Sequence, residues 1–536
     1  MPAEKIAKTP NILLLFVDEM RYDAMGCAGN DIIRTPNLDR MAAEGIRFDR
    51  AYTPVPVCIA ARNSLLHGHR CVTHGRFANN VPDPEPLLHT MPQLLGNAGY
   101  HSQAIGKMHF RPVRKHMGFH RMQLMEEIPD FRQDDEYLMY LKANGYGHKR
   151  EVHGVRNLLY YYPQTSAIPE EHHGSTWVAD RTIDFLHKNA HRPFFCMASW
   201  IAPHPPWNAP EPFASMYASE EMPLPIGLDI PEEDLPIRML QSGAQLPPGT
   251  AKTEMLQRIK ALYYANISLI DKGIGRILDT LDELALSENT LVIFTSDHGE
   301  HLGDYGGWGK STPFDASARI PFLMRMPGVV EKGRESDELV SLLDLMPTYL
   351  DLAETEYPGS PALPGASLLG GGTGGTGSPR NELVIEIGHE NNRWLSLIRG
   401  RHKYNYYLSN GFEELFDLKQ DPQELNNALL SPSPADKQMA MEMKACLTQW
   451  EREHGFESSL EESGELKNFG QKWSMPVGPT TNTQFPRWVS RLPEDESDEM
   501  ESISETVRNA AFGEDTFAPE ELPHFEKWLS IGGSLD

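Results

Sequence analysis

The stretch NILLLFVDEM, residues 11–20, is an apolar run that ends abruptly in two acidic side chains, Asp18 and Glu19. A short apolar run without alternating polar residues predicts a strand that is buried on both faces of a sheet. Three later segments are of similar length: HSQAIG (101–106), PFFCMASW (193–200) and TLVIFTS (290–296). We therefore expect at least four strands of one buried sheet.

Helix-forming segments alternate with these strands. In the longest, residues 263–286, isoleucines and leucines recur at helical spacing, at Ile267, Ile270, Ile274, Ile277, Leu278 and Leu281. Shorter candidates cover residues 35–45, 90–100 and 175–189. Alternating strands and helices predict an α/β fold, with a large, mostly parallel sheet flanked by helices.

A segment rich in glycine, serine and proline, residues 357–380, predicts a linker after this α/β region. The strand-like pieces ELVIEIG, RWLSLIRG and HKYNYYLS follow it at hairpin spacing, and a helix is expected from Ala435 to Glu453. This pattern predicts a smaller C-terminal antiparallel α+β subdomain. The expected divisions are an α/β domain (1–357), the linker (358–380), the subdomain (381–455) and an acidic C-terminal extension (456–536), the last a candidate homo-oligomer contact.

Composition limits the classes of function. The chain of 536 residues has a formal net charge of −26, which argues against a nucleic-acid surface or a polybasic membrane patch but allows a local basic pocket. Five cysteines are few and odd in number, which favours a reducing compartment over a disulfide framework. The apolar start has no cleavage site, and no stretch approaches the roughly 20 apolar residues of a membrane span. We therefore expect a cytoplasmic protein with no membrane partner.

Charged or imidazole side chains follow each of the four predicted strands. They are Asp18 and Glu19, then Lys107 and His109, then His204, and finally Asp297 and His298. Ligands of parallel sheets bind outside the carboxyl ends of the strands, so these side chains are expected to share one pocket.

Asp18, Glu19, Asp297 and His298 offer the ligands that a divalent cation needs. Either acidic pair alone would be an ordinary helix cap or solvated loop. Carboxylates gathered without a counter-charge would repel, so a metal is the simplest explanation for the set.

Four further side chains supply positive charge or hydrogen-bond donors: Lys107, His109, His204 and Lys310. With a metal, they predict a site for a tetrahedral oxyanion. The lysines would hold non-bridging oxygens, and an imidazole would protonate the leaving oxygen.

The stretch VCIAARNSLLHGHR, residues 57–70, contains a candidate nucleophile, Cys58. A lone cysteine is usually an inert core residue. Arg62, however, follows by one helical turn, and the start of the predicted helix AARNSLLHG favours an anion.

The segment VCIAARNSLLHG resembles the signature of type I sulfatases in the alkaline phosphatase superfamily, whose Cys-x-Pro-x-Arg cysteine is oxidised to formylglycine. Further segments are similar to sulfatase blocks in the same order: NILLLFVDEMRYDAMGCAGN, RTPNLDRMAAEGIRFDRAY, GKMHF, PHPPW, YYANISLIDKGIGRILDTLDEL, TSDHGEHLGD and ELFDLKQDPQELNNA. Together they extend over roughly residues 11–428. The resemblance implies an alkaline phosphatase-like fold, a small-molecule sulfate ester as substrate, and a formylglycine-generating maturation enzyme as partner.

The resemblance also implies roles for individual residues. Residue 58 would become formylglycine, whose hydrate attacks sulfur, and Arg62 would orient it. The implied metal ligands are Asp18, Glu19, residue 58, Asp297 and His298. The implied contacts to the sulfate group and its surroundings are Lys107 and Lys310 at its oxygens, His109 beside residue 58, and His204 at the leaving group. His74 falls where family members often carry a histidine near the site.

Three residues depart from the usual sulfatase pattern. Ala60 replaces the usual proline of the modification motif, so the resemblance alone does not establish that Cys58 is converted to formylglycine. Glu19 replaces the commoner second aspartate and is one methylene longer. His298 replaces the asparagine of many calcium sulfatases, which shifts the expectation from strict Ca²⁺ toward Ca²⁺ or Mn²⁺, with Zn²⁺ or Mg²⁺ as alternatives.

Hydrolysis of a sulfate monoester is the leading functional prediction. One alternative is a phosphonate monoester or phosphodiester hydrolase on the same scaffold; the Lys-x-His pair of GKMHF favours sulfate, because those relatives generally lack it. Another is a non-catalytic anion-binding relative with unmodified Cys58. The organic half of the substrate is expected to contact residues 110–146 and 206–253, and the acidic, aromatic first segment could hold a cationic head group, an aryl ring or a sugar.

Overall fold

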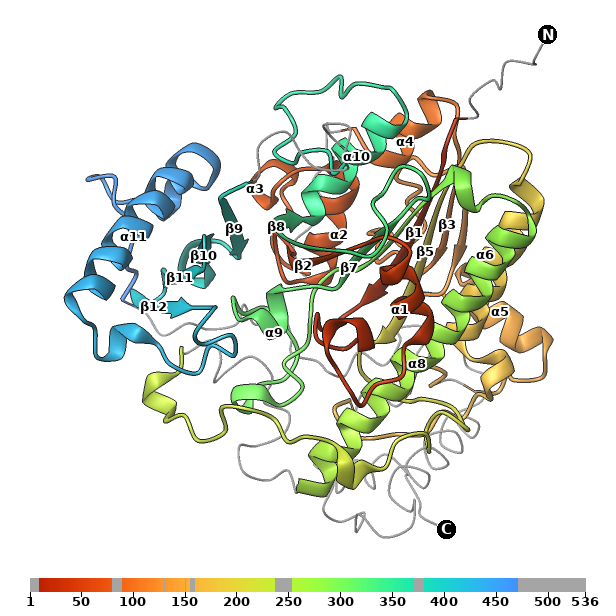
Figure 1. Cartoon of the computed structure of the whole chain (residues 1–536), viewed down its shortest axis with the longest axis horizontal. Coiled ribbons are helices and arrows are strands. Elements are labelled where there is room, and N and C mark those ends of the chain that lie inside the picture. The colour runs from red at the N-terminus through yellow and green to blue at the C-terminus, as the bar shows by residue number, and fades with distance from the viewer. Residues whose placement is uncertain are drawn as a thin grey trace.

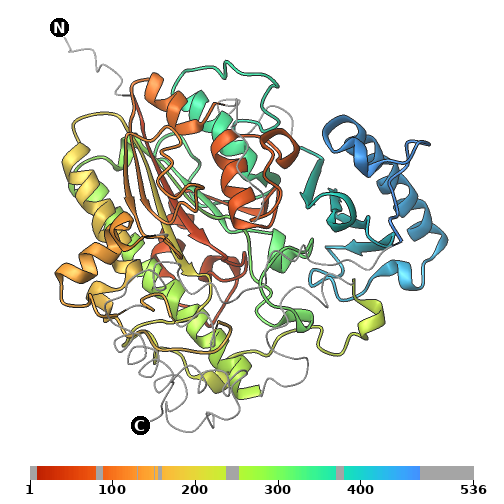
Figure 2. The same ribbon diagram turned by 180° about the vertical axis from the view of Figure 1, so that it is seen from behind.

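A computed structural model describes residues 9–79, 89–129, 131–149, 151–154, 160–236, 253–369 and 380–470. Within these residues the chain forms an eight-stranded sheet and a separate four-stranded sheet. Figures 1 and 2 show the large sheet between two layers of helices, with the small sheet and its helix to one side. The predicted α/β fold with a smaller C-terminal antiparallel subdomain is confirmed.

The large sheet has the strand order β4-β3-β5-β1-β6-β7-β2-β8. Its strands are β1 (Asn11–Asp18), β2 (Ile46–Tyr52), β3 (His101–Gly106), β4 (Arg121–Leu124), β5 (Phe194–Pro203), β6 (Thr290–Ser296), β7 (Phe322–Arg325) and β8 (Arg334–Ser341). All pairings are parallel except those of β7, which runs antiparallel to β6 and β2. The four strands expected from the sequence are the neighbours β3-β5-β1-β6, so their carboxyl ends lie side by side.

Strand β1 shows why this sheet needs helices on both faces. All eight of its residues are buried, and successive side chains of a strand point to opposite faces. Leu13, Leu15 and Val17 belong to one hydrophobic core, whereas Ile12, Leu14 and Phe16 belong to the other.

The first core is covered by α1 (Pro36–Ala43), α6 (Gly174–Asn189) and α8 (Thr253–Glu283), and α8 packs against both α1 and α6. The second core is covered by α2 (Cys58–His67), α4 (Met91–Asn97) and α10 (Leu345–Leu352). Further α-helices in the described part of this region are α3 (Cys71–His74), α5 (Glu136–Ala143) and α9 (Asp315–Ala318). Of the helices in the described ranges, none has the length and apolar character needed to cross a bilayer.

The small sheet is antiparallel in chain order. Its strands are β9 (Glu382–Ile387), β10 (Trp394–Arg399), β11 (His402–Tyr407) and β12 (Phe412–Asp417). Helix α11 (Pro434–His454) packs on β10 and β11 and begins with a capping box between Ser433 and Asp436. Residues 370–379 and 471–536, within the expected linker and extension, lie outside the described residues, so the domain boundaries and the homo-oligomer contact stay predictions.

A buried ion-pair cluster joins the two sheets. Lys403 of β11 donates to Asp315 of α9 at 2.8 Å and lies 2.8 Å from an oxygen of Glu424. The Asp315 amide in turn donates to Glu424 at 2.5 Å. Each of the three side chains is at most 5% exposed. The small sheet is therefore held against α9, which follows strand β6 of the large sheet.

Candidate active site

Two neighbouring strands place aspartates side by side at the edge of the large sheet. Asp18 ends β1, and Asp297 directly follows β6, where its amide donates to the Val17 carbonyl at 3.3 Å. Both side chains are fully buried. One oxygen of Asp297 accepts from the amides of Glu19 and His298, at 3.1 and 3.0 Å, which fixes the carboxylate against both strand ends.

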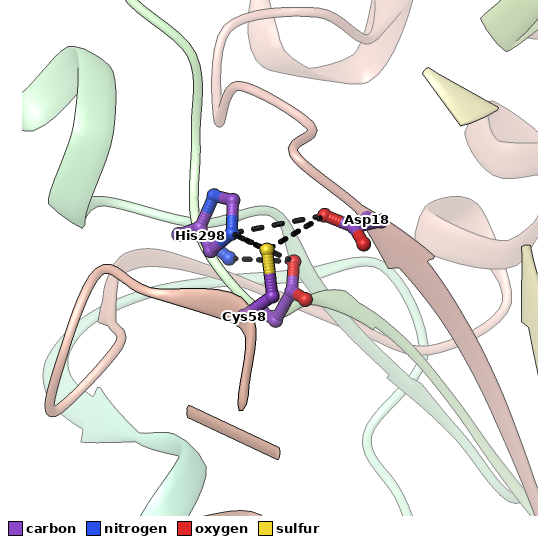
Figure 3. Close-up of side chains that lie close together, drawn as sticks. Asp18, Cys58 and His298 are labelled. Carbon is purple, nitrogen blue, oxygen red and sulfur yellow. Dashed lines mark hydrogen bonds and ion pairs between the residues drawn. The ribbon is translucent and has the colours of Figure 1, made fainter. Parts of the chain in front are cut away.

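Cys58 is the first residue of α2 and points at the same place. Its Sγ lies 3.1 Å from His298 Nε2 and 3.7 Å from Asp18 Oδ1 (Figure 3). The preceding residue, Val57, is extended and gives no side-chain cap, and the Ile59 amide in the first turn of α2 donates instead to Asn79 at 3.0 Å.

Four side chains converge closely enough to hold a metal ion. Ligand atoms of Asp18, Cys58, Asp297 and His298 all lie within 4.8 Å of one another. Two carboxylates and an imidazole suit a divalent cation such as Ca²⁺, Mn²⁺ or Zn²⁺, and an oxygen at residue 58 would fit the same set better than the sulfur for the harder ions. The chemistry of the donor set therefore fits the expected cation.

Arg62, in the next turn of α2, donates hydrogen bonds to residues in or directly after three strands. Its Nε donates to Asp297 at 3.0 Å, and its Nη1 donates to the Lys107 carbonyl at 2.7 Å and to Ser199 at 3.0 Å. Burial alone would lower the pKa of Arg62, but Asp297 and Asp18 raise it. The guanidinium thus stays charged while only 1% exposed.

Lys107 reaches the pocket through a turn that requires glycine. Gly106 has φ of 91°, and a Cβ there would meet the Ser199 carbonyl at 1.9 Å. The Lys107 ammonium contacts Asp18 and lies 2.5 Å from Glu127. Burial would lower the pKa of Lys107, yet the two carboxylates raise it; likewise, burial would raise the pKa of Asp18, yet Lys107 and its other cationic neighbours hold it well below its usual range.

The Glu19 carboxylate contacts a lysine and a histidine of the pocket. One carboxylate oxygen lies 2.6 Å from Lys310 Nζ and 3.1 Å from His204 Nε2, while the other has no hydrogen-bond partner within the described residues. With Asp18 and His204 it forms a second group whose ligand atoms lie within 4.8 Å. Burial raises the pKa of Glu19 well above its usual range. The geometry therefore separates Glu19 from the four-residue group, although both groups share Asp18.

The remaining histidines differ in their relation to this pocket. His204 Nδ1 lies 2.6 Å from the Pro205 carbonyl, which leaves Nε2 facing Glu19. Burial lowers the pKa values of both His204 and His109. His109 is held by its backbone, whose amide donates to Glu126 at 3.0 Å, and no hydrogen bond links it to Cys58 in the described ranges. His74 is bonded to Ser64 of α2 at 2.9 Å rather than to a pocket residue.

Three pocket residues were not expected from the sequence. Ser199 accepts from Arg62, Glu127 contacts Lys107, and Tyr160 OH lies 3.5 Å from His204 Nε2. Glu127 lies in the acidic segment expected near the organic half of the substrate, but spacing could not separate it from Glu126. Ser199 lies within β5 and gave no sequence signal.

Two family models and several known relatives match the chain. Residues 10–355 match the Sulfatase family model, and residues 303–453 match the family described as N-sulphoglucosamine sulphohydrolase, C-terminal. The chain is 35% identical over 455 residues to an arylsulfatase of Clostridium perfringens, covering 79% of this chain and 90% of the relative. It is 30% identical to the multifunctional alkaline phosphatase superfamily protein PehA of Trinickia caryophylli, covering 79% and 92%.

Solved structures share the fold at lower sequence identity. The phosphonate monoester hydrolase of Agrobacterium radiobacter superimposes with a TM-score of 0.72 at 23% identity, covering 83% of this chain and 96% of that one. A protein solved in complex with its substrate D-glucosamine-2-N,6-O-disulfate gives a TM-score of 0.66 at 22% identity, covering 83% and 98%.

Proposed function

The chain belongs to the sulfatase family, and from its membership and its site we propose that it hydrolyses a sulfate monoester with a nucleophile derived from Cys58. The observation that carries the proposal is the convergence of Cys58 with Asp18, Asp297 and His298 beside two lysines. A cation site next to paired ammonium groups suits a tetrahedral oxyanion.

The cation would be held by Asp18, Asp297, His298 and residue 58, and Glu19, which is grouped with Asp18 and His204, is a further candidate ligand. When bound, a divalent cation would supply Lewis-acid stabilisation of charge on a sulfate oxygen. The imidazole favours Mn²⁺ beside Ca²⁺, with Zn²⁺ or Mg²⁺ as alternatives.

The nucleophile would be the hydrate of a formylglycine made from Cys58. Burial raises the pKa of the Cys58 thiol, so the unmodified side chain stays protonated and is a poor nucleophile. Oxidation by the maturation enzyme would remove the sulfur and leave an aldehyde, and addition of water to the aldehyde would give two hydroxyls on the same carbon, one of which attacks. Arg62, one helical turn away, would orient this hydrate.

Lys107 and Lys310 would contact the sulfate oxygens. Each ammonium already contacts a carboxylate, of Asp18 and Glu19 respectively, and so is held ready for an anion. His204 would act at the leaving group: its Nδ1 faces the Pro205 carbonyl, so Nε2 is the atom that can pass a proton to the leaving oxygen.

A phosphonate monoester or phosphodiester hydrolase is the second candidate. It is supported by the 30% identity to a multifunctional superfamily protein. Lys107, whose ammonium contacts Asp18 in the pocket, favours a sulfate ester as substrate over a phosphonate monoester or a phosphodiester.

The test begins with the mass of the proteolytic peptide carrying residue 58, from protein made with a formylglycine-generating maturation enzyme. The aldehyde or its hydrate is expected. Steady-state rates on matched sulfate, phosphonate and phosphodiester esters then follow, and a higher kcat/KM on sulfate supports the proposal. An unmodified thiol with no turnover of any ester would favour the non-catalytic alternative.

A further inference from the structure

A rigid turn presents one carboxylate at the anion pocket. The Glu126 carboxylate accepts from the amides of Met108 and His109 at 2.9 and 3.0 Å, and the Glu126 amide donates to Asp135 at 2.6 Å. The amide of Met125 donates to the Gly106 carbonyl at 3.2 Å. The backbone that carries the next residue, Glu127, is therefore fixed to the end of β3.

Glu127 lies between two groups that the proposed reaction uses. One carboxylate oxygen lies 2.5 Å from Lys107 Nζ, and the other lies 3.8 Å from His204 Nε2. The side chain is 9% exposed. Since His204 is proposed to act at the leaving group, this carboxylate would border the organic half of the substrate.

The two lysines of the pocket already contact carboxyl groups before a substrate enters. Lys107 contacts both Asp18 and Glu127, and Lys310 contacts Glu19. The single negative charge of a sulfate monoester can share these lysines and the cation. A second negative charge on the alcohol portion would approach the fixed carboxylate of Glu127 in a partly buried site, where like charges repel strongly.

The neighbouring surface is aromatic. Tyr160 OH lies 3.5 Å from His204 Nε2, and its ring centroid lies 4.7 Å from that of Tyr161 in an edge-on arrangement. Aromatic faces beside a carboxylate suit an uncharged or cationic group. We propose that Glu127 makes this chain selective for sulfate esters whose alcohol portion carries no negative charge. This inference rests on the proposed sulfatase activity, whose substrate class it narrows.

The test uses three phenyl sulfates that differ in one remote substituent. The parent ester is compared with its 4-carboxymethyl and 4-(trimethylammoniomethyl) derivatives, in which a methylene separates the charge from the leaving oxygen. Each is measured on the mature wild type, on Glu127→Gln, and on Asp184→Asn as a control. Asp184 is a surface carboxylate 43% exposed in a pair with Arg181, so its variant changes net charge equally but away from the pocket.

The wild type is expected to turn over the parent ester with a kcat/KM at least about tenfold above that of the carboxymethyl ester. Glu127→Gln should reduce this ratio by about tenfold and lower the preference for the trimethylammonio ester, whereas Asp184→Asn should leave both ratios unchanged. Equal ratios in Glu127→Gln and the wild type would overturn the inference while leaving the sulfatase activity intact.

Binding separates the two proposals if no ester is hydrolysed. Calorimetric affinities of the three esters are measured on Cys58→Ala and on the double variant with Glu127→Gln. A charge preference lost with Glu127 supports the selectivity even when turnover fails, in which case only the proposed function falls. Affinities insensitive to the substituent, or to Glu127, overturn the selectivity.

Discussion

At the scale of single residues, Cys58 combines a reactive atom with almost complete burial. Its side chain is 1% exposed, and its sulfur contacts His298 and Asp18. Because solvent hardly reaches this side chain, its surroundings are set by the neighbouring protein groups.

Replacing Cys58 with alanine should lower kcat by at least about a thousandfold, because no other described group takes the nucleophile position. Circular dichroism and the thermal midpoint should stay near those of the wild type, since only a small side chain is removed. Rates within tenfold of the wild type would rule out Cys58 as the nucleophile's source.

Asp297→Ala should release the metal. Asp297 belongs to the four-residue group and also accepts from Arg62, so its loss removes a ligand and frees the guanidinium. Elemental analysis should find metal falling from about one equivalent per chain to about zero. The matched control is Asp184→Asn, which should keep its metal; full occupancy in Asp297→Ala would show that the ligand set is misplaced.

The site residues that follow strands were predictable because parallel strands share one edge. Asp18, Lys107, His204 and Asp297 each follow a recognisable apolar run. The direction of a side chain was not predictable: the Glu19 carboxylate turns to Lys310 through a positive backbone φ of 67°. The role of Glu127 was not predictable for the same reason. Glu126 and Glu127 are adjacent and look alike in the sequence, but Glu126 accepts from backbone amides whereas Glu127 contacts Lys107.

At the scale of elements, helix α2 carries the modification motif. Ala60 is its third residue and is fully buried. Amides in the first turn of a helix have no carbonyl partner within it, so proline is tolerated there.

Ala60→Pro should therefore restore the usual motif without unfolding α2. In a host with a formylglycine-generating enzyme, the fraction of aldehyde at residue 58, measured by peptide mass, should rise or stay near complete. The thermal midpoint serves as the control for α2. A fall in aldehyde content with an unchanged midpoint would mean that the maturation enzyme prefers alanine.

Elements differed in how well the sequence predicted them. Helices α6 and α8 and the buried strands were expected because apolar periodicity extends along each one. Strand β12 was missed because its sequence, FEELFD, sets two glutamates in its centre. Glu414 is nonetheless 2% exposed, since Asn405 and Tyr407 donate to its carboxylate at 2.9 and 2.8 Å. Cross-strand partners of this kind cannot be deduced from local patterns.

At the scale of the whole molecule, the cluster of Lys403, Asp315 and Glu424 connects the two sheets. Lys403→Met should lower the free energy of unfolding by about 3–5 kcal/mol, because it removes the cation that pairs with the buried Asp315 carboxylate. Lys444→Met is the control, since Lys444 is 32% exposed in its pair with Glu413 and should cost about 0–1 kcal/mol. Equal losses in chemical denaturation would contradict this role.

The same cluster should make stability depend on pH. Burial raises the pKa of Glu424 to about 8, above the value of about 4.3 in an unfolded chain. The folded state therefore binds the proton more tightly, and this stabilisation is present below about pH 4.3 and lost as the pH rises through about 8. The Glu424→Gln variant lacks this titrating group. As the pH rises from 5 to 8.5, the thermal midpoint of the wild type should therefore fall relative to that of the variant. A constant difference between the two proteins would refute the assignment.

The order of the site residues along the chain also limits the time during which Cys58 can be oxidised. Cys58 is made early, whereas β6 and Lys310, which enclose it, are made about 250 residues later. At about 5–20 residues per second, ribosomal synthesis leaves roughly 10–50 s between these events. Because the finished fold hides the sulfur almost completely, an enzyme that oxidises it must act within that interval or on a chain kept open. Slowing translation between these two points should thus raise the yield of active protein.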